Sequence, residues 1–330
     1  MAKLSANKLK HLEKLSNEKG IIAAAAMDQR GSLKKSIAKE KGVDPKEVTQ
    51  EMMEEFKTAV TKILTPYSTA ILLDPEFGLP AAQARSSNAG LLLAYETTGY
   101  EQNTPGRVPR LIPNYTVSKL VADGANAVKI LLYYSPFEDK KVNEIKHAWV
   151  ERIGVECAYN DIPYFLEFVG YPVKEGEEDN SLSFAKQKPE IVKRSMEEFS
   201  KDKYHVDVLK VEVPINMKFV KGARSFKGEE AYSQDEAKKL FLSTAQATSK
   251  PFIYLSAGVS DDEFRESLEL AAESGVKYNG VLCGRATWKE GIPVYAKHGI
   301  KALETWLSDR GVQNIQALNK VLEKGATSWK

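Results

Sequence analysis

Eight short apolar runs, separated by segments long enough to form helices, constrain the fold of this 330-residue chain more than any other feature. The runs are Ile21–Asp28, Thr69–Asp74, Leu91–Glu96, Ala127–Tyr134, Tyr164–Val169, Val206–Val213, Phe252–Ala257 and Gly280–Arg285. Helical periodicity occurs between most of them, in Glu47–Leu64, Val142–Tyr159, Lys188–Ser200, Gln234–Ala247 and Asp261–Glu273. Eight β-then-α units in one chain predict an α/β fold of the closed (β/α)8 TIM-barrel type, with an open doubly wound sheet as the alternative.

The start of the chain predicts one element in addition to the barrel. Four leucines recur there at helical spacing: Leu4, Leu9, Leu12 and Leu15. We therefore expect an extra amphipathic helix within residues 1–19 that covers part of the barrel. Because the sequence contains no linker, low-complexity tract or internal repeat, a single domain over residues 1–330 is expected.

The segments between the runs differ in length, and one of them is of functional interest. Gly78–Gly90 leaves room for only a short helix, which makes it the weakest part of the predicted barrel. We expect the longest non-helical connection at Gly170–Gln187, which includes the acidic stretch Glu175–Asp179. Loops of this length are often functional, so the segment is either a lid over a site or a plain solvated excursion.

The composition excludes several functional classes. An apolar content of 42%, a charged content of 28% and a net charge of +2 describe a globular protein with no bias toward nucleic acid or membranes. No apolar run approaches the roughly 18 residues of a membrane span, and lysines interrupt the N-terminal region, so neither a membrane segment nor a signal peptide is expected. Cys157 and Cys283 lack metal or redox spacing and fit buried thiols in a reducing cytoplasm.

Charged residues occur inside four of the apolar runs, where side chains alternate between the two faces of a strand. The outside of a barrel must be apolar to receive the helices, so Leu209, Val211 and Val213 of the sixth run face outward, which directs Lys210 and Glu212 inward. The same alternation turns Lys129 and Glu167 inward and places Asp28 on one face with two small alanines. All four charges come late in their runs, toward the C-terminal mouth where such barrels form active sites.

Lys210 is the most informative of these residues, because its run, Val206–Val213, is rich in valine and should be buried. Burial removes water from an ammonium group and favours the neutral amine, which forms Schiff bases with carbonyl substrates. Four inward charges would be costly as core filling, although a structural ion-pair network is the alternative. For Glu212, Asp74 and Glu96, at the ends of runs, structural and functional interpretations both stay open.

Two spots late in the chain have the features of an anion site. The seventh run ends with Ser256 and Gly258 close together, and the eighth ends with Gly284 and Arg285. The loops after the last two strands of a TIM barrel commonly bind phosphate through backbone N–H groups. A hydroxyl, two glycines that allow close approach and a bidentate guanidinium therefore predict a phosphate site.

Metal and nucleotide chemistry find little support in the sequence. The histidines are His11, His147, His205 and His298. None of them lies at the C-terminal end of a predicted strand, and no two have the spacing of metal ligands. The sequence also lacks a glycine-rich dinucleotide motif after a strand and a Walker motif. We therefore expect neither a metal nor a cofactor.

Six segments resemble one known family, and the resemblance extends over essentially the whole chain. They are Ala25–Gly31, Ala127–Tyr134, Phe165–Phe168, Asp207–Glu212, Leu255–Gly258 and Cys283–Ala286. On these residues the chain resembles the class I (Schiff-base) tagatose 1,6-bisphosphate aldolase family, lyases of lactose and galactose catabolism in Gram-positive bacteria. The resemblance implies a metal-independent barrel, a homodimer and a small-molecule ketose bisphosphate substrate. It also implies cleavage, with relaxed stereospecificity, to dihydroxyacetone phosphate and D-glyceraldehyde 3-phosphate.

The resemblance further implies roles for individual residues. It makes Lys210 the Schiff-base lysine and Glu167 the main proton-transfer carboxylate. It makes Asp28 and Lys129 a supporting charged pair. Whether Asp28 or Glu167 accepts the proton of the C4 hydroxyl group stays open.

The substrate has two phosphate groups, and the resemblance implies binding residues for only one of them. For the first phosphate the resemblance implies four residues: Ser256, Gly258, Gly284 and Arg285. For the second, the side chains that follow the first strand are candidates from their chemistry alone: Gln29, Arg30 and Ser32.

Two other functions remain as alternatives. A phosphosugar isomerase or synthase on the same barrel would use Glu167 as its base and Lys210 only to polarise a carbonyl group. A non-catalytic phosphosugar sensor would bind at the charged site without turnover.

Overall fold

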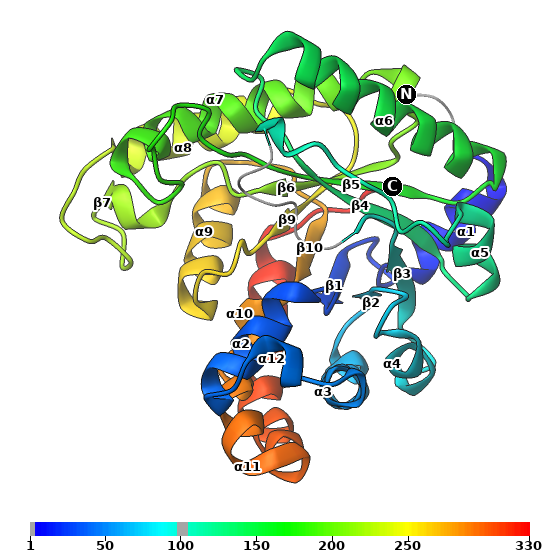
Figure 1. The fold of residues 1–330 in the computed structure, drawn as a ribbon. Helices are drawn as coiled ribbons and strands as arrows, with labels where there is room; N and C mark the ends of the chain where they lie inside the picture. The colour runs from blue at the N-terminus through cyan, green and yellow to red at the C-terminus, as the bar shows by residue number, and fades with distance from the viewer. Residues whose placement is uncertain (1–3, 98–104) are drawn as a thin grey trace.

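The computed structural model describes residues 4–97 and 105–330, and within them eight parallel strands form a closed barrel (Figure 1). Around the barrel the strands follow the order β1, β10, β9, β6, β5, β4, β3, β2 and back to β1. Their bounds are β1 Ile22–Ala26, β2 Ala70–Leu73, β3 Gly90–Ala94, β4 Ala127–Tyr133, β5 Tyr164–Val169, β6 Val208–Glu212, β9 Phe252–Leu255 and β10 Gly280–Cys283. The predicted TIM barrel is therefore confirmed, and the open sheet is excluded.

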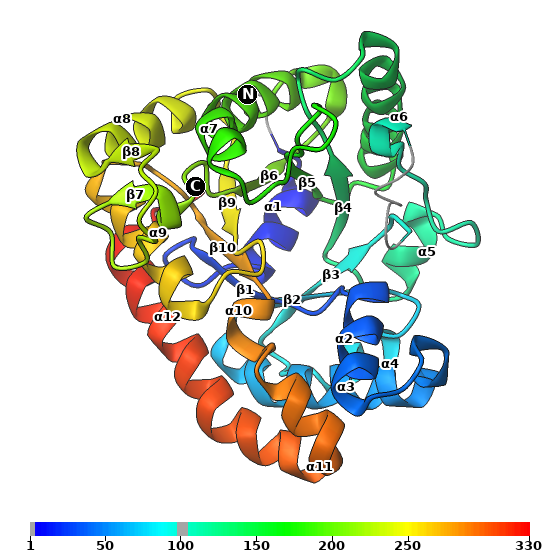
Figure 2. The ribbon, with the colours of Figure 1, turned by 60° about the vertical axis from the view of Figure 1, so that its left-hand side comes forward.

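Helices surround the ring of strands, as Figure 2 shows. They are α2 Gly31–Lys41, α3 Gln50–Leu64, α4 Leu79–Ala84, α5 Val117–Ala122, α6 Lys140–Tyr159, α7 Leu182–Phe199, α8 Gln234–Ala245, α9 Asp261–Glu273, α10 Arg285–Trp288, α11 Gly291–Trp306 and α12 Val312–Gly325. Several begin at a capping side chain; the Thr49 hydroxyl accepts from Met52 N at the start of α3, for example. No helix in the described part of the chain is long and apolar enough to cross a membrane.

The two faces of each strand carry different cores, as the alternation predicts. Leu209 and Val211 of β6 belong to the large outer core beneath the helices, whereas Val208 faces an inner apolar layer. Helix α1, Ala6–Lys14, closes the N-terminal mouth, because the fully buried Leu12 and Leu15 join that inner layer. Figure 2 shows α1 within the outline of the ring of strands.

The predicted N-terminal helix is confirmed, but its leucine pattern is partly wrong. Leu9 is 38% exposed, whereas the neighbouring Lys8 is buried and contacts Asp207, with 2.7 Å between Nζ and Oδ2. A long side chain can bury its stem while its charged end meets a partner, so Lys8 takes the place that the periodicity gave to Leu9.

The boundaries of α7 and of the loop before it correct a prediction. The helix begins at Leu182, capped by the Ser181 hydroxyl, and Pro189 lies inside it rather than near its start. The proline cannot donate to the Ala185 carbonyl, which instead accepts a 3.4 Å hydrogen bond from the Tyr232 hydroxyl. The loop is therefore 170–181, and the connection 213–233 is longer; it contains the short strands β7 Val220–Lys221 and β8 Tyr232–Ser233.

Several strands also end earlier than predicted, and this matters for the site. β1 stops at Ala26, β3 at Ala94 and β10 at Cys283. These three residues therefore lie beyond the strands at the C-terminal mouth: Asp28 in the connection to α2, Glu96 in an isolated bridge with Leu111, and Arg285 at the start of α10.

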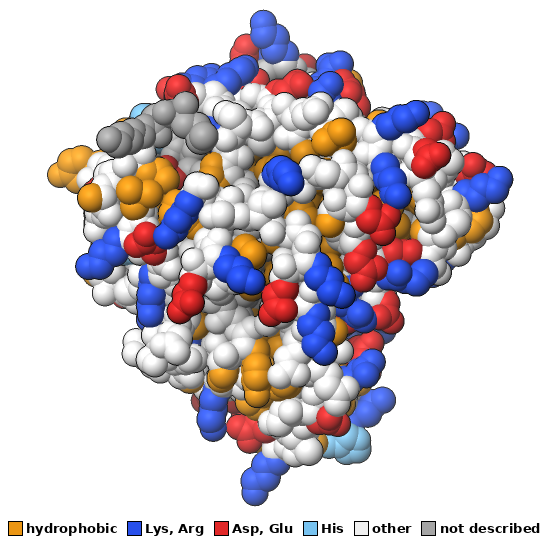
Figure 3. Space-filling view, turned by 180° about the vertical axis from the view of Figure 1, so that it is seen from behind, with side chains coloured by type: hydrophobic (Ala, Val, Ile, Leu, Met, Phe, Trp, Pro, Cys, Tyr) orange, Lys and Arg blue, Asp and Glu red, His pale blue; other side chains and the backbone are white. Residues whose placement is uncertain are grey.

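The described part of the outer surface has no single-sign charged face in the view of Figure 3, where acidic and basic side chains are mixed, in keeping with a net charge of +2.

Candidate active site

The ends of β4, β5 and β6 bring three of the predicted charged residues together. Glu167 lies opposite Lys210 in the ladder between β5 and β6, so both side chains point to the same face. Lys129 reaches the same place from β4. All three are buried: Lys129 is 1% exposed, Lys210 3% and Glu167 8%. The inner apolar layer lies beneath them and keeps water from the base of the site.

One carboxylate oxygen of Glu167 joins the two lysines. Its Oε2 atom lies 2.8 Å from Nζ of Lys210 and 2.9 Å from Nζ of Lys129. The Lys129 Nζ atom also lies 2.7 Å from Oδ2 of Asp28. The four residues that the sequence singled out therefore form one continuous cluster. Lys210 stands at one end of this cluster and contacts Glu167.

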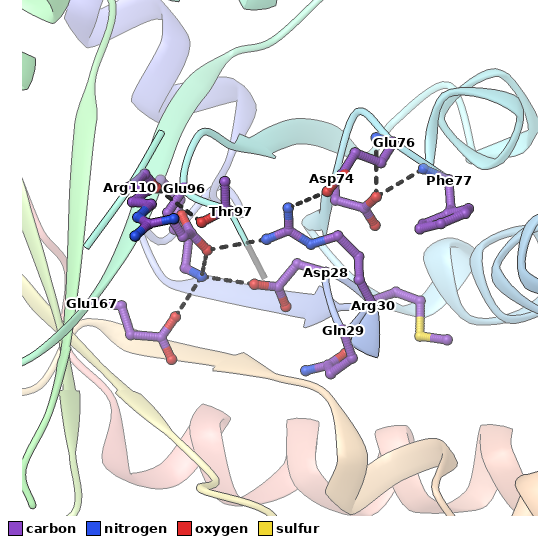
Figure 4. Close-up of polar contacts among 12 residues, drawn as sticks. Asp28, Gln29, Arg30, Asp74, Glu76, Phe77, Glu96, Thr97, Arg110 and Glu167 are labelled. Atoms are coloured by element: carbon purple, nitrogen blue, oxygen red, sulfur yellow. Dashed lines mark hydrogen bonds and ion pairs between the residues drawn. The ribbon is translucent and has the colours of Figure 1, made fainter. Parts of the chain in front are cut away.

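The cluster also contains Glu96, whose interpretation the sequence left open, and Arg30, which the sequence suggested only as a phosphate ligand. Glu96 Oε1 lies 3.0 Å from Nζ of Lys129 and 3.7 Å from a guanidinium nitrogen of Arg30. Figure 4 shows this run of contacts from Glu167 to Arg30. Three carboxylates thus meet three cations, and the buried charge is balanced. A buried charge without a partner would strongly destabilise the fold, whereas in this cluster the attraction between opposite charges offsets the loss of hydration.

The electrostatics keep Asp28 and Glu167 ionised, whereas burial raises the pKa of Glu96 above its ordinary value. Burial alone raises the pKa of Asp28, but Lys129 and Lys210 outweigh it and hold that pKa well below its ordinary value. Burial also raises the pKa of Glu167, and the same lysines again bring the net shift below the ordinary value. Conversely, the surrounding carboxylates outweigh burial and raise the pKa of Lys129 well above normal. Lys129 thus serves as a permanent positive charge.

Two of the four predicted phosphate residues line a cavity of about 530 Å³, whereas Gly258 and Gly284 are not among the residues that line it. Ser256 and Arg285 line it together with the charged cluster. Gly258 has a φ of +83°, which other residues rarely adopt, and a Cβ atom there would lie 2.8 Å from Cζ of Arg285, so a larger residue would be strained and would displace the guanidinium. A cavity of this size suits a small polar ligand.

Backbone packing explains why residue 284 is a glycine. A Cβ atom at this position would lie 2.7 Å from the carbonyl oxygen of Ala26, where β10 passes close to β1. The glycine therefore permits the approach of two strands, whatever its backbone N–H binds.

The three candidates for the second phosphate differ in what their side chains can offer. Gln29, Arg30 and Ser32 all line the cavity. Arg30 is 4% exposed, and its guanidinium lies 2.6 Å from Oε2 of Glu76 in addition to its contact with Glu96. Gln29 Oε1 is buried and has no hydrogen-bond partner among the described residues. An orphaned acceptor suits a substrate hydroxyl group better than a phosphate oxygen.

Arg107 is a further cation on the cavity wall that the sequence did not indicate. Its guanidinium lies 4.8 Å from the ring centroid of Tyr133 and 4.7 Å from that of Tyr171. Held between two rings, the side chain is oriented without a carboxylate partner in those contacts. Arg107 stands in an irregular segment outside any apolar run, so no periodic signal could have identified it.

The residues whose interpretation stayed open have different surroundings. Glu212 lines the cavity and contacts Lys188, with 3.1 Å between Oε1 and Nζ, while its other oxygen accepts a 2.7 Å hydrogen bond from Gly170 N. It thereby ties α7 and the 170–181 loop to the barrel mouth. Asp74 is fully buried outside the cavity lining and pairs with Lys57 at 2.6 Å.

Histidine and cysteine residues take no part in this cluster. His147 is half-buried on α6 and lies 3.0 Å from the Tyr134 hydroxyl. Cys157 and Cys283 are buried free thiols, as predicted. Across residues 4–97 and 105–330, no group of three or more His, Cys, Asp or Glu side chains could hold a metal ion.

Comparison with known sequences identifies one family and several relatives. A profile described as DeoC/LacD family aldolase matches residues 22–290. "Tagatose 1,6-diphosphate aldolase 2" of Enterococcus faecalis is 51% identical over 329 residues, which is 100% of this chain and 97% of that protein. "Tagatose 1,6-diphosphate aldolase" of Listeria monocytogenes serotype 4a is 50% identical over 100% of this chain and 95% of that protein. A protein of the same name from Staphylococcus epidermidis is 48% identical, with 99% and 98% covered.

Two solved structures share the fold at low sequence identity. The first is a fructose-bisphosphate aldolase from Plasmodium falciparum, with a TM-score of 0.69, 14% identity and coverage of 98% of this chain and 97% of that one. The second is a Schiff base-forming fructose-1,6-bisphosphate aldolase, with a TM-score of 0.56, 15% identity and coverage of 94% and 98%. At such identities the likeness concerns the barrel alone.

Proposed function

The chain belongs to the DeoC/LacD family of aldolases, and from this premise we propose that it reversibly cleaves tagatose 1,6-bisphosphate through a Schiff base on Lys210. The products are dihydroxyacetone phosphate and D-glyceraldehyde 3-phosphate. The observation that carries the proposal is the buried Lys210 amine at the cavity, 2.8 Å from a carboxylate that a second lysine keeps ionised. A general base in contact with a nucleophilic amine is the arrangement that imine chemistry requires.

The first half of the reaction takes place at the Lys210 nitrogen. Glu167 accepts a proton from the ammonium group, and the neutral amine attacks the C2 carbonyl carbon to give a carbinolamine. The protonated Glu167 then donates to the carbinolamine hydroxyl, which leaves as water and yields an iminium ion. Lys129 keeps its positive charge throughout and limits the build-up of negative charge around Glu167.

The second half breaks the C3–C4 bond. Asp28 lies on the far side of Lys129 from Lys210, so we assign it the proton of the C4 hydroxyl group. As that proton leaves, the C3–C4 electron pair moves into the iminium to form an enamine, and the aldehyde product departs. Because Asp28 is ionised but weakly basic, its proton transfer accompanies bond breaking rather than preceding it. The protonated Asp28 then returns its proton to C3 of the enamine, which regenerates the iminium ion, and hydrolysis by water releases the second product and the amine.

Substrate binding, assembly and cell compartment complete the proposal. Ser256, Gly258, Gly284 and Arg285 hold the 1-phosphate. Arg107, which forms no ion pair with a carboxylate among residues 4–97 and 105–330, binds the 6-phosphate, and Gln29 faces the hydroxyl groups between the two phosphates. The family supports a homodimer and relaxed stereospecificity. The two free thiols support a reducing cytoplasm.

Borohydride trapping tests the proposed chemistry. Sodium borohydride added with the ketose bisphosphate should reduce the imine to a stable secondary amine, which mass spectrometry locates on the peptide that contains Lys210. A coupled assay for triose phosphate is run in parallel. An isomerase or synthase would leave no adduct, and a sensor would release no triose phosphate; either result rejects the aldolase.

An Arg285→Ala variant tests the 1-phosphate site. Loss of a charge-assisted contact of about 1.5–3 kcal/mol should raise KM for tagatose 1,6-bisphosphate roughly 10- to 100-fold, with a smaller effect on kcat. Steady-state kinetics measure both constants. Arg152→Ala, which removes an exposed arginine of α6, is the matched control and should change neither. An unchanged KM in Arg285→Ala would place the phosphate elsewhere.

A further inference from the structure

A second buried lysine lies behind the turn that carries Asp28. Lys57 on α3 and Asp74 after β2 both have side chains that are 0% exposed. The Lys57 Nζ atom donates to the carbonyl oxygens of Met27 at 2.6 Å and Gln29 at 2.8 Å, and to Asp74 Oδ2 at 2.6 Å. All three N–H groups of the ammonium therefore have an acceptor. Neither Lys57 nor Asp74 lines the cavity.

The two carbonyl groups flank Asp28 at the point where the strand leaves the barrel. β1 ends at Ala26, and Met27 N still donates to the Leu72 carbonyl at 2.8 Å. Beyond the Met27 N–H group the chain leads into α2, so the sheet no longer fixes the backbone from the Met27 carbonyl group onward. A buried carbonyl group without a donor is costly, and Lys57 supplies the donor for both.

Asp74 extends this support to the neighbouring turn. Its second oxygen, Oδ1, accepts from Phe77 N at 2.8 Å and from Glu76 N at 3.1 Å. Glu76 in turn lies 2.6 Å from the Arg30 guanidinium, as Figure 4 shows. The pair thus connects the turns after β1 and β2 from the side away from the cavity.

We propose that Lys57 and Asp74 form a buried support that fixes residues 27–30 and so holds Asp28 in place against Lys129. Lys57 is then a positioning residue for the proton transfer at Asp28, because it touches neither the substrate nor the Asp28 carboxylate. This inference rests on the proposed function. A displacement of about 1 Å in such a group can lower a rate by about 10²-fold, so the support should affect catalysis as well as stability.

A double-mutant cycle separates positioning from a purely structural role. Lys57→Met should lower kcat by roughly 30- to 100-fold and change KM by less than about threefold. In an Asp28→Asn background, the same substitution should lower kcat by less than about threefold, because the group that Lys57 positions is already lost. Borohydride trapping of dihydroxyacetone phosphate on Lys210, which does not involve Asp28, should stay within about twofold of the wild type.

Controls keep the outcome interpretable. Lys57→Met leaves Asp74 buried without its cation, so Asp74→Asn, which keeps an acceptor of the same shape, is carried through the same cycle in case the first variant does not fold. Lys8→Met combined with Asp207→Asn removes a buried pair at the opposite mouth and should lower Tm while leaving kcat unchanged.

Three results would overturn the proposed support. The first is that the losses in kcat of Lys57→Met and Asp28→Asn add in the double variant, and the second is that folded variants of Lys57 and Asp74 keep the wild-type kcat. The third is that borohydride trapping on Lys210 falls by the same factor as kcat. A wild-type protein that neither traps nor cleaves would instead reject the proposed function. The two failures are therefore distinguishable.

Discussion

Replacement of Lys210 by methionine should abolish cleavage of the ketose bisphosphate, with kcat lowered by about 10⁴-fold or more, while the fold remains intact. The amine is the atom that bonds to the substrate, and methionine has none. Methionine matches the length of the lysine stem and suits a site that is 3% exposed. Glu167 also keeps Lys129 as a partner at 2.9 Å, so no carboxylate is left unpaired. The coupled assay for triose phosphate measures the loss, and circular dichroism and Tm report on the fold.

Lys8→Met is the matched control for this experiment, because Lys8 is another buried lysine paired with a carboxylate, but at the N-terminal mouth. It should lower Tm and keep the wild-type kcat. Residual cleavage near the wild-type rate in the Lys210 variant would refute the Schiff-base assignment. Loss of activity together with loss of the fold would be resolved by Lys210→Arg, which keeps the charge near Glu167 but forms no such imine.

Much of the barrel could be predicted because the direction of each strand side chain depends only on its neighbours in the sequence. Alternation along a strand separates an outer apolar face from an inner one, so the inward direction of Lys210, Glu167 and Lys129 follows from their neighbours alone. The barrel then brings strand ends together without further information. Recognition of the family is likewise confirmed, because the quoted segments lie in the matched region.

The rest of the site depends on turns, where periodicity carries no information. Glu96 and Arg30 stand beyond the ladders, and the sequence does not specify that both reach Lys129 or its carboxylates. Arg107 is oriented by two aromatic rings from separate segments, and Lys57 by backbone carbonyl groups far away in the chain. The predicted start of a helix at Lys188 was wrong for a similar reason: the helix begins at Leu182, and the Tyr232 contact that accommodates Pro189 inside it comes from another part of the fold.

Lys129→Met should have the largest effect on stability of any single change in the site. The Lys129 Nζ atom contacts Asp28 at 2.7 Å, Glu96 at 3.0 Å and Glu167 at 2.9 Å. Loss of one member of such a buried cluster leaves charge uncompensated and should lower the free energy of unfolding by about 3–5 kcal/mol at neutral pH. We also expect kcat to fall by roughly 10²- to 10⁴-fold, because the carboxylates lose the charge that keeps them ionised.

The pH dependence of stability should change sign in this variant. In the wild type, Asp28 and Glu167 have pKa values below their ordinary ones, so their contribution is present at neutral pH and is lost as the pH falls below about 4. Without Lys129, Glu167 keeps its contact with Lys210, but Asp28 loses the cation that contacts it, so we expect burial to raise the pKa of Asp28. Its protonated form then stabilises the fold at low pH, and this contribution is lost as the pH rises. Calorimetric Tm values should therefore increase from about pH 8 to about pH 5 in Lys129→Met but not in the wild type. Adding Glu96→Gln to Lys129→Met should restore part of the stability at neutral pH, because it removes one of the unpaired carboxylates. If Tm instead depends on pH in the same way in Lys129→Met and in the wild type, Lys129 does not set the pKa values of these carboxylates.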